Sequence, residues 1–258
     1  MSSEVELSRR DAILTVTMNR PEKRNAMSST MLARLLETFA GLQQDAETRV
    51  VVVRGAGRAF CAGLDLAELA AAKAAQGTVG LTEIGDVFHA LERVPQPTIA
   101  MVQGEAIAGG CELALHCDLR VAAADVRFAM PLARLGLVIP LPLIQKLLDA
   151  MGTAQTKELL FTGDFFAAER VLALHLVNRL VPLAELEEAT YGLAETIAAN
   201  APLAVRAFKR AIFRANAFRR TIEHEDYDAE VALIAQSEDV AEGVAAMRER
   251  RKPRFLGR

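Results

Sequence analysis

The sequence has no tryptophan, two tyrosines and three cysteines in 258 residues. Because the cysteine count is odd and no secretory hydrophobic segment is recognisable, we expect no disulfide framework and a reducing, cytoplasmic setting. No CxxC pair or His/Cys cluster has the spacing of metal ligands, so we expect no metal site. No apolar run reaches the ~20 residues that span a bilayer. Cys61, Cys111 and Cys117 are therefore expected to be small buried side chains.

Several phosphate-binding and catalytic fingerprints are also missing. There is no GxxxxGK[ST] motif, which excludes a P-loop, and no GxSxG motif, which excludes a nucleophile elbow. Gly55 and Gly57 follow an apolar run, but Phe60 takes the place of the third glycine of a dinucleotide-binding fingerprint. The sequence therefore predicts no nicotinamide site.

The composition is that of a folded protein, with 52% hydrophobic and 24% charged residues. The length favours one α/β body, residues 1–195, followed by a helical region, residues 196–258. The formal net charge of −3 makes nucleic acid or an anionic membrane an unlikely partner. Lysine and arginine gather locally within residues 206–220 and 248–254, which we interpret as solvated helix faces.

Hydrophobic periodicity predicts strands and helices that alternate through about residue 123, with helices dominating afterwards. The expected strands are residues 12–18, 50–53, 98–102, 119–123 and 177–181. Helices are expected from a cap at Ser28 or Ser29, and over residues 82–93, 143–151, 153–161 and 167–174, then from Leu183 onward with breaks at 200–202 and near Thr221. Residues 128–142 are expected to form an irregular apolar loop, and the small and polar residues 70–80 a mobile segment.

The chain is organised around residues 103–118 (QGEAIAGGCELALHCD). Gly109 and Gly110 come before a helical pattern, so they would offer unpaired N–H groups and the positive end of a helix dipole. Such a turn suits an anion or a carbonyl oxygen that gains negative charge. Glu112 lies within the first helical turn among apolar residues, where a carboxylate needs a partner, a raised pKa or a function.

A second strand-to-helix turn lies at residues 59–65 (AFCAGLD). By itself it could be no more than a capped connection. Two such turns with free N–H groups can converge on one oxygen, which would polarise a thioester carbonyl toward an enolate.

Both stretches, residues 59–66 and 104–118, resemble the signatures of the crotonase (enoyl-CoA hydratase/isomerase) superfamily. The resemblance extends to residues 19–26 (NRPEKRNA), 128–136 and 174–182. It implies an α/β fold built as a spiral of ββα units, with a C-terminal helical region that forms homotrimers, often paired as hexamers. It also implies an acyl-CoA thioester as substrate and no further cofactor, since coenzyme A is part of the substrate.

By the same resemblance, the N–H groups of Leu64 and Gly109 would form the oxyanion hole, and Glu112 would be the catalytic acid or base. The positions that resemble the CoA and substrate-binding residues of the family are Arg24, Ala26, Ala62, Asp65, Leu66, Gly110 and Leu132.

The sequence departs from the hydratases at Leu132, where their second catalytic glutamate follows the residue that corresponds to Pro131. Syn hydration uses two carboxylates on one water, so Leu132 weakens that mechanism. Enoyl-CoA hydration remains the leading expectation. The alternatives are a single-carboxylate isomerase, decarboxylase or acyl-CoA hydrolase, or a CoA- or RNA-binding protein without activity. Substitute proton carriers could be Glu83, Asp86, His89, Glu105 or His116.

Overall fold

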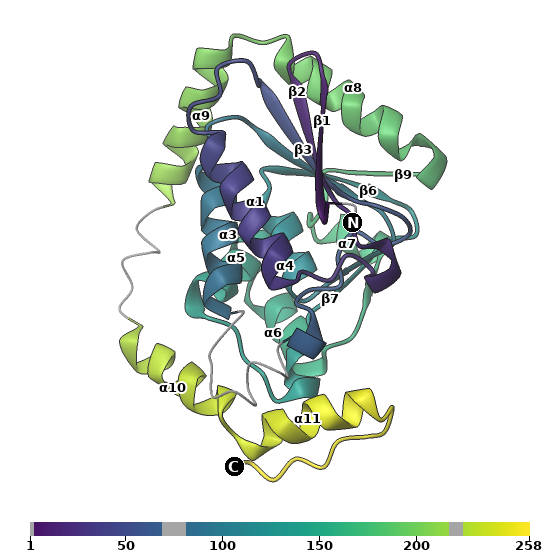
Figure 1. Ribbon diagram of the computed structural model, residues 1–258, viewed down its shortest axis with the longest axis vertical. Helices are drawn as coiled ribbons and strands as arrows, with labels where there is room; N and C mark the ends of the chain where they lie inside the picture. Colours follow the sequence, from purple (N-terminus) through teal and green to yellow (C-terminus); the bar gives the residue numbers. More distant parts are fainter. Residues whose placement is uncertain (1–2, 69–80, 217–223) are drawn as a thin grey trace.

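A computed structural model describes residues 3–68, 81–216 and 224–258 (Figure 1). Its main sheet has six strands in the order β1-β2-β3-β4-β6-β9, and all neighbours are parallel except β1 and β2. These strands are β1 (Val5–Arg10), β2 (Ile13–Met18), β3 (Val50–Gly55), β4 (Thr98–Val102), β6 (Leu119–Ala123) and β9 (Arg179–Val181). A smaller sheet, ordered β5-β7-β8, contains β5 (Glu105–Ile107), β7 (Arg127–Ala129) and β8 (Phe166–Ala167).

Helices surround the two sheets. Those in the first part of the chain are η1 (Pro21–Lys23), α1 (Ser29–Gly41), α3 (Leu81–Arg93), α4 (Gly109–His116) and η2 (Pro131–Leu135). The later ones are α5 (Leu141–Met151), α6 (Thr153–Thr162), α7 (Ala168–Ala173), η3 (Leu183–Glu185), α8 (Leu186–Ala198), α9 (Pro202–Ala215), α10 (Glu225–Ala235) and α11 (Glu238–Arg248). No helix in these described ranges is long and apolar enough to cross a bilayer.

The main sheet is covered on both faces, and β3 shows how. Val51 and Val53 point into the larger core with α1, α3, α4 and α5, whereas Val50 and Val52 pack on the opposite face against Tyr191 and other residues of α8. Figure 1 shows α8 on the side of the sheet away from α1 and α3. A strand that is buried on both faces reads as a continuous apolar run, which is why four successive valines occur here.

Most of the predicted elements are confirmed, including the cap at Ser28, whose hydroxyl accepts a hydrogen bond from the Met31 N–H at 3.0 Å. Four strands, β1, β5, β7 and β8, were not predicted, because β1 exposes five of its six residues and the other three have only two or three residues each. The expectation of an irregular loop over residues 128–142 was wrong: the segment contains β7, η2 and the start of α5. The predictions for residues 70–80 and for Thr221 lie outside the described residues.

The boundary expected after residue 195 falls inside α8, which packs on the main sheet. We therefore propose that the C-terminal helical region begins with α9. In Figure 1, α10 and α11 lie together at one end of the molecule.

Candidate active site

The two glycine turns of the sequence meet in the structure. A parallel bridge joins Cys61 to Ala106, with a hydrogen bond of 2.9 Å from the Ile107 N–H to the Cys61 carbonyl. A Cβ added at Gly63 would lie 3.2 Å from the nitrogen of Gly109, and one added at Gly110 would lie 2.1 Å from the carbonyl oxygen of Cys61. The close approach of the two turns therefore requires glycine at these positions.

Each turn presents an N–H group that donates to none of the described residues. Among the residues that the structure describes, the N–H groups of Leu64 and Gly109 have no hydrogen-bond acceptor. Gly109 is the first residue of α4, so its N–H lies at the positive end of the helix dipole. The preceding Ala108 has φ 49° and ψ −117°, a conformation that costs a non-glycine residue roughly 1–3 kcal/mol. Strain of this kind is typical of functional sites.

Glu112 is a buried carboxyl without a hydrogen bond. Its side chain is 1% exposed, and neither oxygen has a partner within the described ranges. The nearest charged or titratable nitrogen is Nδ1 of His116, 3.7 Å from Oε2. That nitrogen is 2.7 Å from the carbonyl oxygen of Glu112, and because a carbonyl only accepts, His116 donates its Nδ1 proton there. His116 also stacks on Phe88, with 4.8 Å between the ring centroids.

Burial raises the pKa of Glu112 well above its usual range. Two further charges act on it, Lys146 lowering the pKa and Glu92 raising it. Lys146 Nζ lies 2.7 Å from Glu92 Oε1, so these two charges form an ion pair between α5 and α3 and act on Glu112 in opposite directions. Glu112 therefore holds its proton more tightly than an exposed glutamate does, which suits a group that acts as a general acid or base.

The raised pKa makes stability depend on pH. The folded protein binds the Glu112 proton more tightly than the unfolded chain, so this contribution to stability is fully present below the unfolded pKa and is lost as the pH rises through the folded pKa. We expect the free energy of unfolding of Glu112→Gln, relative to wild type, to increase as the pH rises above the usual carboxyl range. Urea denaturation of both proteins over a pH series measures this difference, and a constant difference would contradict the expectation.

Three predicted binding residues lie together on the loops beside the turns. The Ala62 N–H donates to the carbonyl oxygen of Arg24 at 3.0 Å. Ala26 lies two residues after Arg24 on the same loop. The Arg24 side chain is 68% exposed, and its Nη1 lies 3.2 Å from Glu105. Arg24 therefore presents a guanidinium to solvent from the loop that contacts the turn of Ala62.

The other predicted binding residues have contacts within the fold. Asp65 forms an ion pair of 3.0 Å with Arg20. Leu66 and Leu132 are half-buried and pack with Leu135, Leu137 and Val240, so they form an apolar cluster beneath α11.

Of the alternative proton carriers that the sequence suggested, His116 contacts Glu112, and the others lie elsewhere. Glu105 pairs with Arg24 and Arg127 on the outside of β5. Glu83, Asp86 and His89 lie on the exposed face of α3, while the opposite face of that helix, including Ile84 and Phe88, is buried.

The sequence did not predict that Glu92 and Lys146 would act on Glu112. The sequence feature that could have indicated these two residues is a charged side chain on the otherwise apolar face of each helix.

The cysteines are inert. All three are buried and unpaired, and burial raises the pKa of both Cys61 and Cys117 to about 12. In the described part of the chain, no group of three or more His, Cys, Asp or Glu residues could hold a metal ion.

The sequence model of one family, described as "Enoyl-CoA hydratase/isomerase", matches residues 8–258. The chain belongs to this family. The expected superfamily and its α/β fold are thus confirmed. Enoyl-CoA hydratase domain-containing protein 2, mitochondrial, from Homo sapiens is 38% identical over 255 residues, which cover 95% of this chain and 86% of that protein. Short-chain-enoyl-CoA hydratase from Clostridium acetobutylicum is 34% identical over 213 residues, 82% of each chain.

A solved structure of similar shape is that of methylmalonyl CoA decarboxylase complexed with 2S-carboxypropyl CoA. Its TM-score is 0.90 at 28% identity, and the alignment covers 100% of both chains. The enoyl-CoA hydratase/isomerase fold of this chain is therefore shared with proteins of more than one activity.

Proposed function

We propose that this protein binds an acyl-CoA thioester and moves a proton on its acyl chain, as an enzyme of the enoyl-CoA hydratase type. The observation that carries the proposal is the pair of unpartnered N–H groups, from Leu64 and Gly109, on two turns beside the buried acid Glu112. The N–H groups would stabilise the thioester oxygen as it gains charge. Glu112, with its raised pKa, would carry the proton at Cα or Cβ.

Hydration of an enoyl-CoA is the leading reaction, since both oxyanion elements and one acid are present. Leu132 packs in two apolar clusters at the position where the hydratases would have a second carboxylate. A water molecule at the site would therefore have one hydrogen-bonding carboxylate instead of two. A single-carboxylate isomerisation, decarboxylation or thioester hydrolysis is the second candidate. The similarity to methylmalonyl CoA decarboxylase supports it.

The test is a turnover assay of the purified protein. We expect loss of enoyl absorbance with crotonyl-CoA or with longer 2-enoyl-CoAs. Product masses from enoyl-, 3-hydroxyacyl- and branched acyl-CoAs then distinguish hydration from the other reactions. Intact CoA binding without turnover of any enoyl-CoA would refute the hydratase assignment and leave the fold unaffected.

Replacing Leu132 with glutamate tests the role of this position. Because a positioned acid or base contributes about 10²–10⁴ in rate, we expect Leu132→Glu to raise the hydration rate at least tenfold. Leu132→Gln is the matched control, since its side chain has the same shape and cannot transfer a proton. The initial rate of crotonyl-CoA hydration is the measurement. Equal rates for the two variants would show that the missing carboxylate does not limit hydration.

Arg24, Ala26, Ala62, Asp65, Leu66, Gly110 and Leu132 are the proposed CoA and substrate-binding residues. The exposed guanidinium of Arg24 suits a phosphate of coenzyme A. We propose no further cofactor, and a cytoplasmic location.

The region after α8 is proposed to assemble the protein into trimers or hexamers. α9 has no buried residue, and Leu203, Phe208 and Ile212 on it are 80%, 68% and 64% exposed. Exposed apolar residues gathered on one helix are typical of an interface. We expect Phe208→Asp to yield smaller species in analytical ultracentrifugation. Arg34→Asp, at an exposed position of α1, is the control and should leave the assembly intact.

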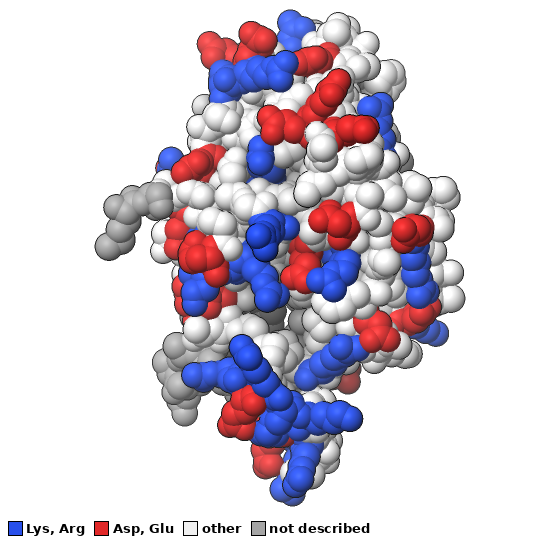
Figure 2. Space-filling view, turned by 90° about the vertical axis from the view of Figure 1, so that its right-hand side faces the viewer, with Lys and Arg blue, Asp and Glu red and all other residues white. Residues whose placement is uncertain are grey.

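Binding of RNA is a weaker alternative. Figure 2 shows lysine and arginine side chains over the end of the molecule that holds the C-terminal tail, with acidic side chains among them. Arg251 pairs with Glu242 and Glu249, and Arg258 pairs with Glu238. These pairs and the net charge of −3 reduce the attraction for a phosphate backbone.

A further inference from the structure

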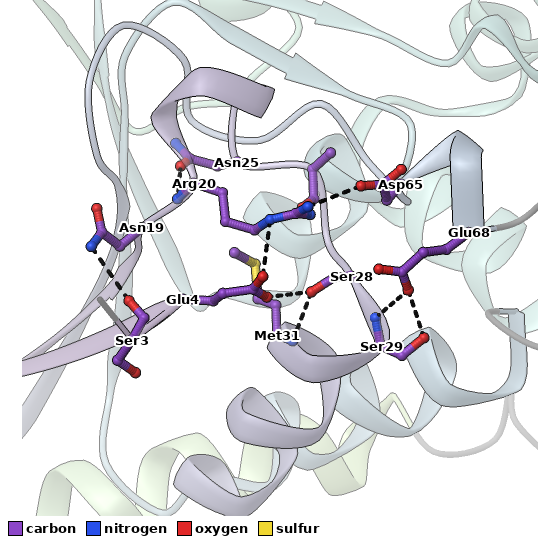
Figure 3. A network of polar contacts seen from close by, with 11 residues as sticks. Ser3, Glu4, Asn19, Arg20, Asn25, Ser28, Ser29, Met31, Asp65 and Glu68 are labelled. Carbon is purple, nitrogen blue, oxygen red and sulfur yellow. Dashed lines mark hydrogen bonds and ion pairs between the residues drawn. The ribbon is translucent and has the colours of Figure 1, made fainter. Parts of the chain in front are cut away.

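Arg20 belongs to the sequence motif of residues 19–26, and the proposed chemistry gives it no role. Its guanidinium joins three segments of the chain (Figure 3). Nε lies 3.2 Å from Glu4 Oε1, Nη2 lies 3.0 Å from Asp65 Oδ2, and Nη1 donates to the carbonyl oxygen of Ala26 at 2.6 Å. The side chains of Arg20 and Asp65 are only 14% and 11% exposed. Water therefore screens this ion pair less than it would a pair on the surface.

Two of the three segments that Arg20 joins, those of Ala26 and Asp65, hold Leu64 in place. The Met27 N–H donates to the carbonyl oxygen of Gly63 at 2.7 Å, and the Asp65 N–H donates to the carbonyl oxygen of Met27 at 2.9 Å. This short parallel bridge flanks Leu64 on both sides and leaves its N–H without an acceptor. Arg20 binds Ala26 on one side of the bridge and Asp65 on the other.

Asp65 and Glu4, the two acidic partners of Arg20, form further hydrogen bonds within the fold. Burial acts to raise the pKa of Asp65. A hydrogen bond from the Ala67 N–H, together with the hydrogen bond and positive charge of Arg20, holds that pKa below its usual range. Ala67 donates at 3.0 Å, so Asp65 also caps the helical turn after Leu64. Glu4 accepts from the hydroxyl of Ser28, the residue that caps α1. Figure 3 shows this network converging on Arg20 from both sides.

The two halves of the proposed oxyanion hole are thus supported differently. Gly109 is part of α4, whose backbone hydrogen bonds fix its direction. Leu64 lies between strands and helices, and the bridge to Met27 supports it. A displacement of about 1 Å in such a group can cost 10²-fold in rate.

We propose that Arg20 is a positioning residue that orients the Leu64 N–H toward the substrate oxygen, an inference that rests on the proposed function. The guanidinium is suited to this task because one planar group reaches three acceptors at fixed angles. A lysine ammonium is a single point charge and does not span Glu4, Ala26 and Asp65 together.

The first experiment compares steady-state kinetics of Arg20→Met, Arg20→Lys and wild type. We expect both variants to lose about 10²-fold in kcat, as when one oxyanion donor is removed, while KM changes less than about threefold. Arg20→Lys keeps the charge and is the milder variant if Arg20→Met folds poorly. The control is Arg9→Met, which breaks the ion pair of 3.0 Å between Arg9 on β1 and Asp45. This variant should keep kcat.

The second experiment is hydrogen–deuterium exchange of the peptide that covers residues 61–68, and it does not require turnover. We expect exchange there to be roughly tenfold faster in the Arg20 variants, with β3 and β4 unchanged, because local opening is separate from global unfolding. Unchanged exchange at residues 61–68, or equal acceleration throughout the main sheet, would overturn the proposal. So would an unchanged kcat in both Arg20 variants of an active enzyme. A wild type without turnover would refute the proposed function alone, and the exchange result would still decide the role of Arg20.

Discussion

Glu112→Gln is expected to lower kcat by about 10²–10⁴-fold while acyl-CoA binding is retained. Glutamine keeps the size of the buried side chain and removes its ability to carry a proton. Because the Glu112 pKa is raised by burial, wild type should show a pH-dependent limb of kcat above the usual carboxyl range, and the variant should lack it. Steady-state kinetics over a pH series measure both effects.

Glu158→Gln is the matched control, since Glu158 is a half-exposed carboxylate paired with Arg170 on α7. It should leave kcat and its pH dependence unchanged. If Glu112→Gln turned over acyl-CoA as fast as wild type, Glu112 would have no role in proton transfer. If both proteins bound CoA esters alike and neither turned any over, the protein would be a CoA-binding member of the family without activity.

Gly110→Ala is expected to damage both the fold and the site. The added Cβ would lie 2.1 Å from the carbonyl oxygen of Cys61 and 2.7 Å from its carbonyl carbon, so backbone has to move. Overpacking of this kind costs about 1–3 kcal/mol of unfolding free energy. The movement separates the turn of Leu64 from that of Gly109, and we expect kcat to fall by about 10²–10³-fold. Chemical denaturation and steady-state kinetics of the same preparation provide the two measurements.

Gly192→Ala is the corresponding control. Gly192 lies inside α8, and a Cβ there would meet nothing within 4 Å. Alanine is the better helix former by about 1 kcal/mol, so this variant should gain stability and keep kcat. A Gly110→Ala protein with wild-type kcat would show that the two turns need not be in contact for catalysis.

Features that depend on local patterns could be predicted from the amino-acid sequence. The four valines of β3 predicted a strand covered on both faces, and Ser28 predicted the start of α1. Glycine pairs before a helical pattern predicted free N–H groups, because that property belongs to the backbone of the turn itself. The family motifs at residues 59–66 and 104–118 were enough to identify the superfamily.

Other features could not be predicted, because they join residues that are distant in the sequence and meet only when the chain folds. The approach of Gly63 to Gly109, the ion pair between Glu92 and Lys146, and the reach of Arg20 to Asp65 all depend on how helices and turns pack. Local patterns do not encode such contacts. For the same reason, local patterns did not exclude the carboxylates on the exposed face of α3 as candidates. They also did not predict β5, whose three residues pair with β7 although α4 and β6 lie between them in the chain.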